Sequence, residues 1–342
     1  MTPYLLSILK DPKSGKSLTL FNEEYDSNGN IISGELKTFT GEKYKIINGI
    51  PRFLKNAPVK SVEAFGNQWN FFNFVQFKNE WLNHTVKNTW GDTNIFKGKI
   101  IIDAGGGSGA QGKWFLEYGA KHLIILDLSN SLDDVAKRNL IDADPKKYDL
   151  IQCSIDNPPL KSNCTKGLIY CHNVIQHTPS VEKTLYALYE LLSNGGELAF
   201  NCYPLNDKGL IRWIRFHIIY KNLRRVLTRL SFKNRLYYAR IIAFLRLIPI
   251  LGFLLEKLNF TLQGNIPKVN GENYINNLKR RYRSTLVNTF DYYGAHTFQW
   301  HLSNKSIKDI LSNLYPKPSK IMNKEKYFIR PQPIGCALRI IK

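Results

Sequence analysis

The sequence predicts an α/β fold with a mostly parallel sheet, a small β-rich module in front of it and a helical insertion after it. From Lys99 onward, short apolar runs alternate with helical stretches, which is typical of βαβ units and a parallel sheet. The first 54 residues instead place turn signals between short apolar runs. The expected regions are a β-rich module at 1–54, a helical segment at 55–95, an α/β core at 96–205, a basic helical insertion at 206–290 and a C-terminal part at 291–342.

Composition limits the class of protein. The chain has 342 residues, with 48 Lys and Arg against 27 Asp and Glu, and a formal net charge of +21. An apolar content of 43% and a charged content of 22% exclude collagen-like, coiled-coil and wholly disordered proteins. The charge favours nucleic acid, anionic lipid or a phosphorylated substrate as a partner.

The five Cys residues are odd in number and form no Cys-x-x-Cys pair, so neither a disulfide framework nor a zinc site is predicted. No basic leader or long apolar run begins the chain, so no signal peptide is expected. The most apolar window, Ile241–Leu255, has 15 residues and contains Arg246 and Pro249, whereas a membrane span needs about 20. A cytoplasmic protein is expected, either free or peripheral at a membrane.

A glycine-rich turn after an apolar run is the strongest local signal, at Ile100–Gly109. Glycines let the backbone approach a ligand, and the helix expected from Gln111 offers its N–H groups to a negative group. A tight strand-to-helix turn without a ligand is the alternative. Two nucleotide patterns compete: Gly-x-Gly-x-x-Gly of dinucleotide sites, and Asp-x-Gly-x-Gly-x-Gly of S-adenosylmethionine (SAM) sites. The dinucleotide pattern uses Gly107, Gly109 and Gly112, and Asp127 follows Gly107 by 20 positions. The SAM pattern uses Asp103, Gly105, Gly107 and Gly109.

Further strands and two motifs follow the glycine turn. The expected strands are Leu123–Asp127, Asp149–Asp156, Gly167–His172 and a fifth that ends at Phe200, with a helix at Ser180–Leu192. Val174–His177 reads Val-Ile-Gln-His, and Leu191–Leu198 reads Leu-Leu-x-x-Gly-Gly-Glu-Leu. In this order and spacing, residues 96–203 resemble class I SAM-dependent methyltransferases of the broad small-molecule type. The resemblance implies a Rossmann-like sheet, mostly parallel with its last strand antiparallel, and SAM as the cofactor.

The resemblance also implies roles for individual residues. The loop of Gly105, Gly107 and Gly109 would pack on the methionine part of SAM, and Asp103 would order that loop near the amino group. Asp127 would take the ribose hydroxyls, with Leu128 beside the adenine. The loop of Ser154, Ile155 and Asp156 would face the adenine edge, and Cys171 and His172 would line the cofactor near the sulfonium.

The chain departs from the family pattern at two points. Ser154 stands where the family usually has Asp, although Asp156 could substitute, and Lys166-Gly167 replaces Phe-Asp. Asp156-Asn157-Pro158-Pro159-Leu160 resembles the Asn-Pro-Pro-aromatic signature of enzymes that methylate amide or base nitrogens. It lacks the aromatic ring and follows the third strand, so a rigid turn is the preferred interpretation.

Two histidines are candidate catalytic residues, His177 and His172, each with a structural role as the alternative. A general base needs a pKa near the working pH, which makes histidine suitable. The aromatic stretch 291–301, which includes Tyr292, Tyr293 and His301, resembles the border of the acceptor site in related enzymes.

Residues 5–54 resemble the short zinc-ribbon module that often precedes such domains. The zinc ligands of that module would stand at Asp11, Ser14, Lys37 and Thr40, and none is Cys here. Because structural zinc needs thiolate or imidazole ligands, no metal is expected. The helix containing Phe65-Gly66-x-Gln68-Trp69 resembles the pre-domain helix that folds over the cofactor, with core packing as the alternative.

The basic insertion carries eleven Lys and Arg and no Asp or Glu between residues 208 and 255. Its bases interleave with apolar residues, which suits an anionic membrane surface or a lipid-phosphate substrate, while a solvated lid is the alternative. In the membrane interpretation Trp213, Phe216, Ile218 and Ile219 enter the interface, and Arg212, Arg215, Arg224 and Arg225 meet headgroups.

The expected function is methyl transfer from SAM to a small-molecule, lipid-linked or glycan-linked acceptor, without a metal. An RNA methyltransferase and a degenerate SAM-binding scaffold are the alternatives, and nucleic acid is the less favoured partner because the insertion is so apolar.

Overall fold

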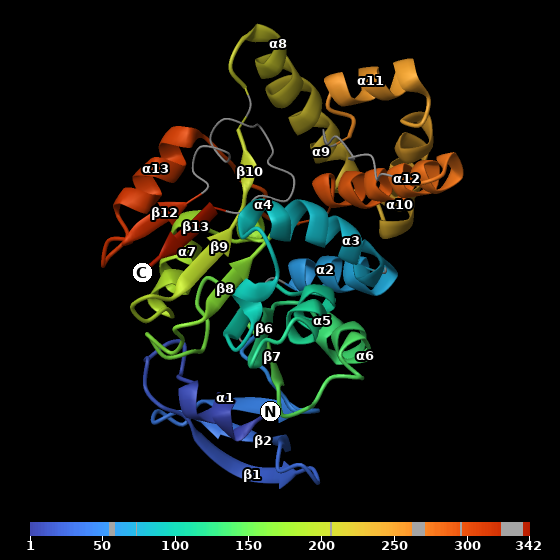
Figure 1. The fold of residues 1–342 in the computed structure, drawn as a ribbon. Helices are drawn as coiled ribbons and strands as arrows, with labels where there is room; N and C mark the ends of the chain where they lie inside the picture. Colours follow the sequence, from blue (N-terminus) through green and yellow to red (C-terminus); the bar gives the residue numbers. More distant parts are fainter. Residues whose placement is uncertain (55–58, 73, 206, 262–270, 295, 323–337) are drawn as a thin grey trace. The chain divides into compact units, whose positions relative to one another are not determined.

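The structure is a computed structural model that describes residues 1–54, 59–72, 74–205, 207–261, 271–294, 296–322 and 338–342 (Figure 1). It contains two compact units. The first comprises Met1–Tyr203 with Thr297–Lys342, and the second comprises Pro204–His296. Cys336, one of the five cysteines of the sequence, lies outside the described residues.

A seven-stranded sheet forms the centre of the first unit, in the order β12-β13-β9-β8-β5-β6-β7. The five strands from β5 to β9 pair in parallel, whereas β13 is antiparallel to both β9 and β12. This confirms the predicted sheet with its antiparallel last strand. The strands are β5 (Ile100–Ala104), β6 (His122–Asp127), β7 (Tyr148–Gln152), β8 (Leu168–Cys171), β9 (Glu197–Phe200), β12 (Lys320–Met322) and β13 (Leu338–Ile341).

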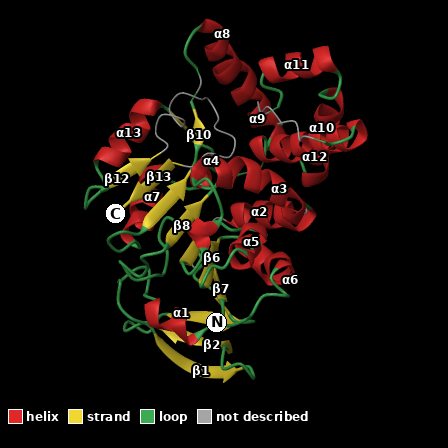
Figure 2. Ribbon diagram, viewed as in Figure 1, coloured by secondary structure: helices red, strands yellow, loops and turns green. Residues whose placement is uncertain are grey.

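Helices cover both faces of this sheet because its central strands are apolar on both sides (Figure 2). Trp114 and Phe115 of α5 pack on one face, and Leu185 and Leu188 of α7 on the other. The helical elements of this core are α5 (Ala110–Glu117), α6 (Lys137–Asn139), α7 (Val181–Glu190), α13 (Asn304–Ser312), η3 (Asn94–Phe96), η4 (Leu132–Ala136) and η5 (Ile175–His177). Two short strands, β10 (Tyr203–Pro204) and β11 (His301–Leu302), form a separate two-stranded sheet.

The third strand of the core is shorter than the sequence predicts. β7 ends at Gln152, four residues before Asp156, because Asn157 N–H donates to the Ser154 carbonyl in a turn. Leu160, beyond the two prolines, is fully buried. The segment contacts the front module, where Lys10 N–H donates to the Pro159 carbonyl at 3.0 Å. The Asn-Pro-Pro segment is therefore a rigid turn that joins module and core.

The front module is a four-stranded antiparallel sheet, drawn in blue in Figure 1. Asp149 of β7 anchors it, since its carboxylate accepts hydrogen bonds from the N–H and hydroxyl of Thr2, both at 2.6 Å. His122 Nε2 lies 2.9 Å from the same carboxylate. The elements are α1 (Pro3–Ile8), β1 (Thr19–Tyr25), β2 (Ile31–Lys37), β3 (Lys43–Ile47) and β4 (Ile50–Pro51).

The aromatic-rich stretch after the module forms a chain of short helices, as its composition predicts. Trp81 is buried between these short helices and the core. The centroid of its ring lies 5.0 Å from that of Trp114 and 5.5 Å from that of Phe115. Such aromatic pairs add stability beyond their buried area. The elements are α2 (Val59–Phe71), η1 (Phe74–Phe77), α3 (Lys78–Glu80), η2 (Trp81–Val86) and α4 (Lys87–Thr89).

The second unit is helical and has a tyrosine-rich interior. Tyr292 and Tyr293 are buried and lie 4.5 and 5.7 Å from the Tyr220 ring, centroid to centroid. Both tyrosines therefore belong to the core of this unit. Its elements are α8 (Leu210–Trp213), η6 (Ile214–Tyr220), α9 (Lys221–Leu227), α10 (Phe232–Leu245), α11 (Pro249–Lys257) and α12 (Tyr274–Tyr292).

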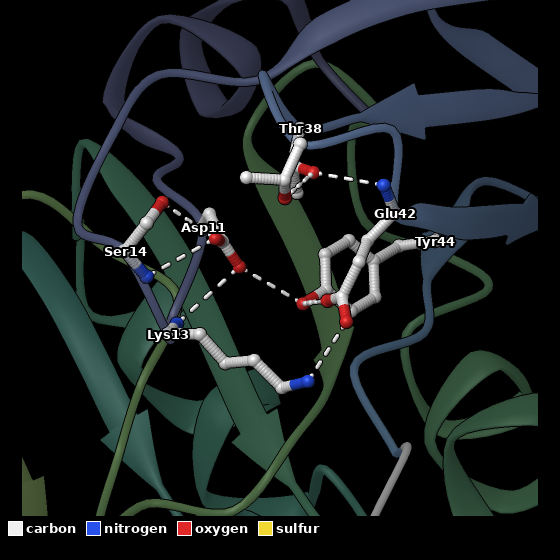
Figure 3. A network of polar contacts seen from close by, with 7 residues as sticks. Asp11, Lys13, Ser14, Thr38, Glu42 and Tyr44 are labelled. Carbon is white, nitrogen blue, oxygen red and sulfur yellow. Dashed lines mark hydrogen bonds and ion pairs between the residues drawn. The ribbon is translucent and has the colours of Figure 1, made fainter.

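A polar network joins two loops of the front module where the resemblance would place metal ligands (Figure 3). Asp11 accepts hydrogen bonds from the Ser14 hydroxyl at 2.6 Å and the Tyr44 hydroxyl at 2.9 Å. In the facing loop, the Thr38 hydroxyl accepts from Glu42 N–H at 2.9 Å, and Lys13 pairs with the Glu42 carboxylate at 2.8 Å. These contacts connect the loops without thiolate or imidazole groups.

We predict that Asp11→Asn lowers the free energy of unfolding by about 1–3 kcal/mol, the usual cost of disturbing hydrogen bonds to a buried charge. Burial alone would raise the pKa of Asp11, but hydrogen bonds from Ser14, Tyr44 and the backbone lower the pKa below the ordinary value of 3.8 for aspartate. The ionised group therefore stabilises the fold above that value, and this contribution is lost as the pH falls through the lowered pKa. Denaturant titration at pH 7 and pH 3 measures both effects.

The exposed carboxylate of Glu23 in β1 supplies the matched control, because Glu23→Gln should leave the unfolding free energy unchanged at both pH values. Elemental analysis should find no stoichiometric zinc, and a chelator should not move the melting temperature. One zinc per chain would show that the network is not what connects the loops.

Candidate functional site

The glycine loop after β5 has a backbone that strongly favours glycine. Gly105, Gly107 and Gly109 have φ values of 83°, 49° and 70°, in the left-handed region that side chains disfavour. The N–H of Gly105 donates to the Leu126 carbonyl at 2.6 Å, which ties the loop to the end of β6. A Cβ on Gly105 would collide with Val174. The loop conformation therefore follows from contacts within the chain as well as from any ligand.

Asp127, at the end of β6, holds the glycine loop through a hydrogen bond. Its Oδ2 accepts from Gly107 N–H at 2.8 Å, and its Oδ1 accepts from the N–H and hydroxyl of Ser129 at 2.8 and 2.6 Å. Burial raises the pKa of Asp127, although these hydrogen bonds act in the opposite direction. The resemblance implied that Asp103 orders the loop, whereas the hydrogen bond from Gly107 N–H goes to Asp127.

Asp103, at the end of β5, is buried like Asp127, but its carboxyl group is less completely hydrogen-bonded. It is 2% exposed, and its Oδ2 has no hydrogen-bond partner among the described residues. The carboxyl group lies against Gly106, where a Cβ would stand 2.8 Å from Oδ2. Burial, with a smaller contribution from the charge of Asp127, raises the pKa of Asp103 to about 8. A buried carboxylate of this kind favours a cationic partner.

Helix α2 lies over the glycine loop. The Trp69 ring stands against Gly107, where a Cβ would be 2.6 Å from it, and Gly66 lies against the side chain of Asn130. The Phe65 ring lies 5.8 Å from the ring of His177, centroid to centroid. This helix therefore covers the ends of β5 and β6 and reaches the loop that follows β8.

The end of β8 contributes Cys171 and His172. Burial raises the pKa of the Cys171 thiol, so this side chain is neutral and apolar in character. The His172 ring stacks on Tyr170 at 5.5 Å, and its Nε2 has no hydrogen-bond partner within the described ranges. Burial lowers the pKa of His172 to about 4, which makes the imidazole neutral and weakly basic at pH 7.

The loop after β8 carries the second histidine and a buried amide. His177 is 8% exposed, and its Nδ1 lies 3.2 Å from the Phe298 carbonyl. Gln176 is fully buried, and neither atom of its side-chain amide has a hydrogen-bond partner in the part of the chain that the structure describes. Asn173 and Asn201 bond to each other, which fixes this loop to the end of β9.

The stretch from Thr297 to His301 lies along this loop. Trp300 donates from its backbone to the Gln176 carbonyl and from its indole to the Thr178 carbonyl, both at 2.9 Å. His301 lies 5.6 Å from the Tyr203 ring, centroid to centroid. The predicted aromatic border 291–301 is thus divided, since Tyr292 and Tyr293 are core residues of the second unit.

The residues predicted to surround the adenine lie after β6 and β7. Leu128 is partly buried beside Asp127, and Ile155 is 5% exposed. Asp156 accepts a hydrogen bond from the Ser154 hydroxyl and lies 3.8 Å from the Lys183 ammonium. Ser154 and Asp156 therefore act as a pair within the turn.

Sequence reasoning missed Arg52 and Gln152 on this side of the site. The Arg52 guanidinium donates to Gln152 Oε1 at 2.7 Å and to Asp133 Oδ2 at 3.0 Å. Gln152 in turn donates to the Leu128 carbonyl at 3.3 Å. Arg52 lies in the front module, about eighty positions before Asp133, so no local pattern could reveal this contact.

Comparisons with known proteins agree with this geometry in part of the chain. Residues 102–200 match the family model described as a methyltransferase domain. A search of the curated proteins gives no match.

Three of the solved structures with partial similarity are described as methyltransferases. A SAM-dependent methyltransferase from Mesorhizobium loti is 24% identical, with 31% of this chain and 47% of that chain covered and a TM-score of 0.28. A putative methyltransferase from Bacillus halodurans is 19% identical, with 37% and 53% covered and a TM-score of 0.32. The N-methyltransferase NodS from Bradyrhizobium japonicum, in complex with S-adenosyl-L-homocysteine, is 11% identical, with 43% and 74% covered and a TM-score of 0.35.

The chain spans about half the length of the first two of these structures. The family match covers β5 to β9, which carry the glycine loop, Asp103, Asp127 and His172. The segment from Ile102 to Phe200 is therefore similar to a methyltransferase domain.

Proposed function

We propose that the protein transfers a methyl group from SAM to a small or lipid-linked acceptor at the carboxyl ends of β5, β6 and β8. The observation that carries this proposal is the buried carboxyl group of Asp103, whose Oδ2 has no hydrogen-bond partner among the described residues. It stands directly before a glycine loop in a methyltransferase domain. A cationic ligand at this place offsets the cost of burying the charge.

SAM fits this site better than a dinucleotide does. Its amino group and sulfonium are both cationic, so the charge of Asp103 favours it. The pyrophosphate of a dinucleotide is anionic and would meet two buried carboxyl groups, those of Asp103 and Asp127. The pattern Gly107-x-Gly109-x-x-Gly112 is therefore not sufficient evidence for a nicotinamide site.

Different residues of the site would contact different parts of SAM. Asp127 accepts hydrogen bonds and suits ribose hydroxyls, while the backbone of Gly105 and Gly107 permits close approach. Trp69 and Phe65 of α2 cover this region and exclude water. When bound, SAM supplies an electrophilic methyl group, and in-line transfer depends mainly on how the acceptor is positioned.

The acceptor side is formed by the loop after β8 and by Thr297–His301. His172 is neutral and weakly basic at pH 7, so it suits hydrogen bonding better than proton removal. His177 is the better candidate for a general base: if its Nδ1–H donates to the Phe298 carbonyl, its Nε2 is the basic nitrogen. A general base is needed if the atom that receives the methyl group is a hydroxyl oxygen.

Methyl transfer from labelled SAM to separated lipid, small-molecule and RNA fractions of a cell extract tests the acceptor class. The proposal expects label in the lipid or small-molecule fraction. Label confined to RNA, and removed by ribonuclease, would support the RNA methyltransferase alternative instead. Binding of SAM without transfer to any fraction would favour a SAM-binding scaffold.

We predict that Asp127→Asn weakens SAM binding by about 1.5–3 kcal/mol, because it removes charge-assisted hydrogen bonds. Calorimetric titration measures the effect, and Asp134→Asn provides the control, since Asp134 is an exposed carboxylate in η4, after β6. Equal SAM affinity in the Asp127 variant and the wild type would contradict the assigned role. Tighter binding of NADH than of SAM would overturn the choice of cofactor.

SAM binding should also depend on pH through Asp103. Below a pKa of about 8, Asp103 is mostly protonated in the protein without ligand, and a bound cation favours its ionised form. SAM affinity should therefore rise between pH 6 and pH 7.5, by up to about tenfold per pH unit. Titrations across this range should show a flat, weaker profile for Asp103→Asn. A wild-type affinity that does not change with pH would argue against a contact between Asp103 and the cation.

A further inference from the structure

Helix α11 of the second unit has an apolar face that is exposed. Ile250, Phe253 and Leu254 follow the spacing i, i+3, i+4 and are 79%, 58% and 47% exposed. Gly252, on the opposite face, is buried against the Arg246 carbonyl, where a Cβ would collide. The helix therefore packs through Gly252 and the partly buried Leu251 and Leu255, and it presents Ile250, Phe253 and Leu254 outward.

The end of α10 continues the exposed apolar surface. Ile241 and Phe244 are 41% and 63% exposed, and Ile248, between the two helices, is 46% exposed. The other face of α10 is buried, including Ala239 and Ala243. We call the exposed apolar residues of the α10–α11 hairpin the apolar patch, which consists of Ile241, Phe244, Ile248, Ile250, Phe253 and Leu254.

The charge that interrupts this window in the sequence points inward. Arg246 is 8% exposed, donates to Glu256 Oε1 at 2.5 Å and donates to the Thr285 hydroxyl at 2.8 Å. It therefore fixes the hairpin from within and leaves the apolar patch uninterrupted. Lys257 lies at the edge, with its ammonium 5.2 Å from the centre of the Phe253 ring.

The unit that carries the patch is strongly basic. Between residues 204 and 296 the sequence has 17 Lys and Arg but four Asp and Glu. All four acidic residues already pair within the unit: Asp207 with His217, Glu256 with Arg246, Glu272 with Arg280 and Asp291 with His296. Exposed bases remain on the surface, and they include Lys208, Lys221, Arg225, Arg229, Lys233, Arg240, Lys257 and Lys279.

We propose that the α10–α11 hairpin docks on an anionic lipid bilayer, with the apolar patch in the interface and the exposed bases against the headgroups. An apolar face beside a basic surface is the combination that binds such membranes. A second copy of the chain is a poor occupant, because two surfaces of like charge repel. No helix of the described residues is both long and apolar enough to cross a bilayer, so the contact is peripheral.

The structure divides the residues that the sequence expectation placed at the membrane. Phe216 is buried, Arg215 donates to the Asn259 side chain, and Arg224 donates to the His296 carbonyl. These residues of η6 and α9 pack within the unit, whereas Trp213 and Ile218 are 47% and 48% exposed. The proposed contact is centred on the hairpin that follows them, and Trp213 and Ile218 remain candidates for it.

Vesicle flotation without SAM tests this proposal separately from methyl transfer. The wild type should bind phosphatidylglycerol vesicles at low and at physiological salt, and bind pure phosphatidylcholine at least about tenfold less. The variant Ile250→Ser/Phe253→Ser should lose about tenfold or more of its binding to phosphatidylglycerol at physiological salt. Equal melting temperatures would show that the substitutions leave the fold intact.

A matched variant controls for the loss of exposed apolar side chains. Ile141 and Phe39 of the first unit are 76% and 84% exposed, so Ile141→Ser/Phe39→Ser changes the same residue types away from the hairpin. It should bind vesicles like the wild type. Absence of binding to phosphatidylglycerol at both salt concentrations would overturn the proposal, and so would equal losses in the two variants. Sedimentation that shows a lipid-free dimer, dispersed by Ile250→Ser/Phe253→Ser, would assign the patch to a second copy instead.

Discussion

The hydrogen bond between the Asp127 carboxylate and Gly107 N–H is the constraint on which the candidate site depends. It joins the end of β6 to the glycine loop after β5, and the same carboxylate also orders Ser129. Asp103 lies close by, without a partner for Oδ2 in the described ranges. Asp127 therefore stabilises the loop, and Asp103 is left for a cation, although both lie at the ends of neighbouring strands.

The covering of this site comes from segments far apart in the sequence. Helix α2 places Trp69 on Gly107 and Phe65 beside His177. Thr297–His301 returns from the second unit and bonds to the loop after β8 through Trp300. Because these segments meet at the carboxyl ends of the parallel strands, they can enclose a ligand where α/β sheets commonly bind one.

Polar contacts elsewhere in the molecule replace features that the sequence pattern suggested. In the front module, Asp11 and Tyr44 connect loops where the resemblance would place metal ligands. In the second unit, Arg246 is turned inward by Glu256, so a charge in an apolar window leaves the outer surface apolar. Each case follows from a buried polar group that must find a hydrogen-bond partner.

The sequence by itself determined the parallel strands, the glycine loop and the acids at the ends of β5 and β6, because these depend on local apolar runs and turn residues. Tertiary structure decided what contacts them. The position of Trp69, the bond from Arg52 to Gln152 and the direction of Arg246 depend on groups distant in the chain. Periodicity predicts which residues form a strand or helix, whereas the partner of a buried side chain is set by packing between elements.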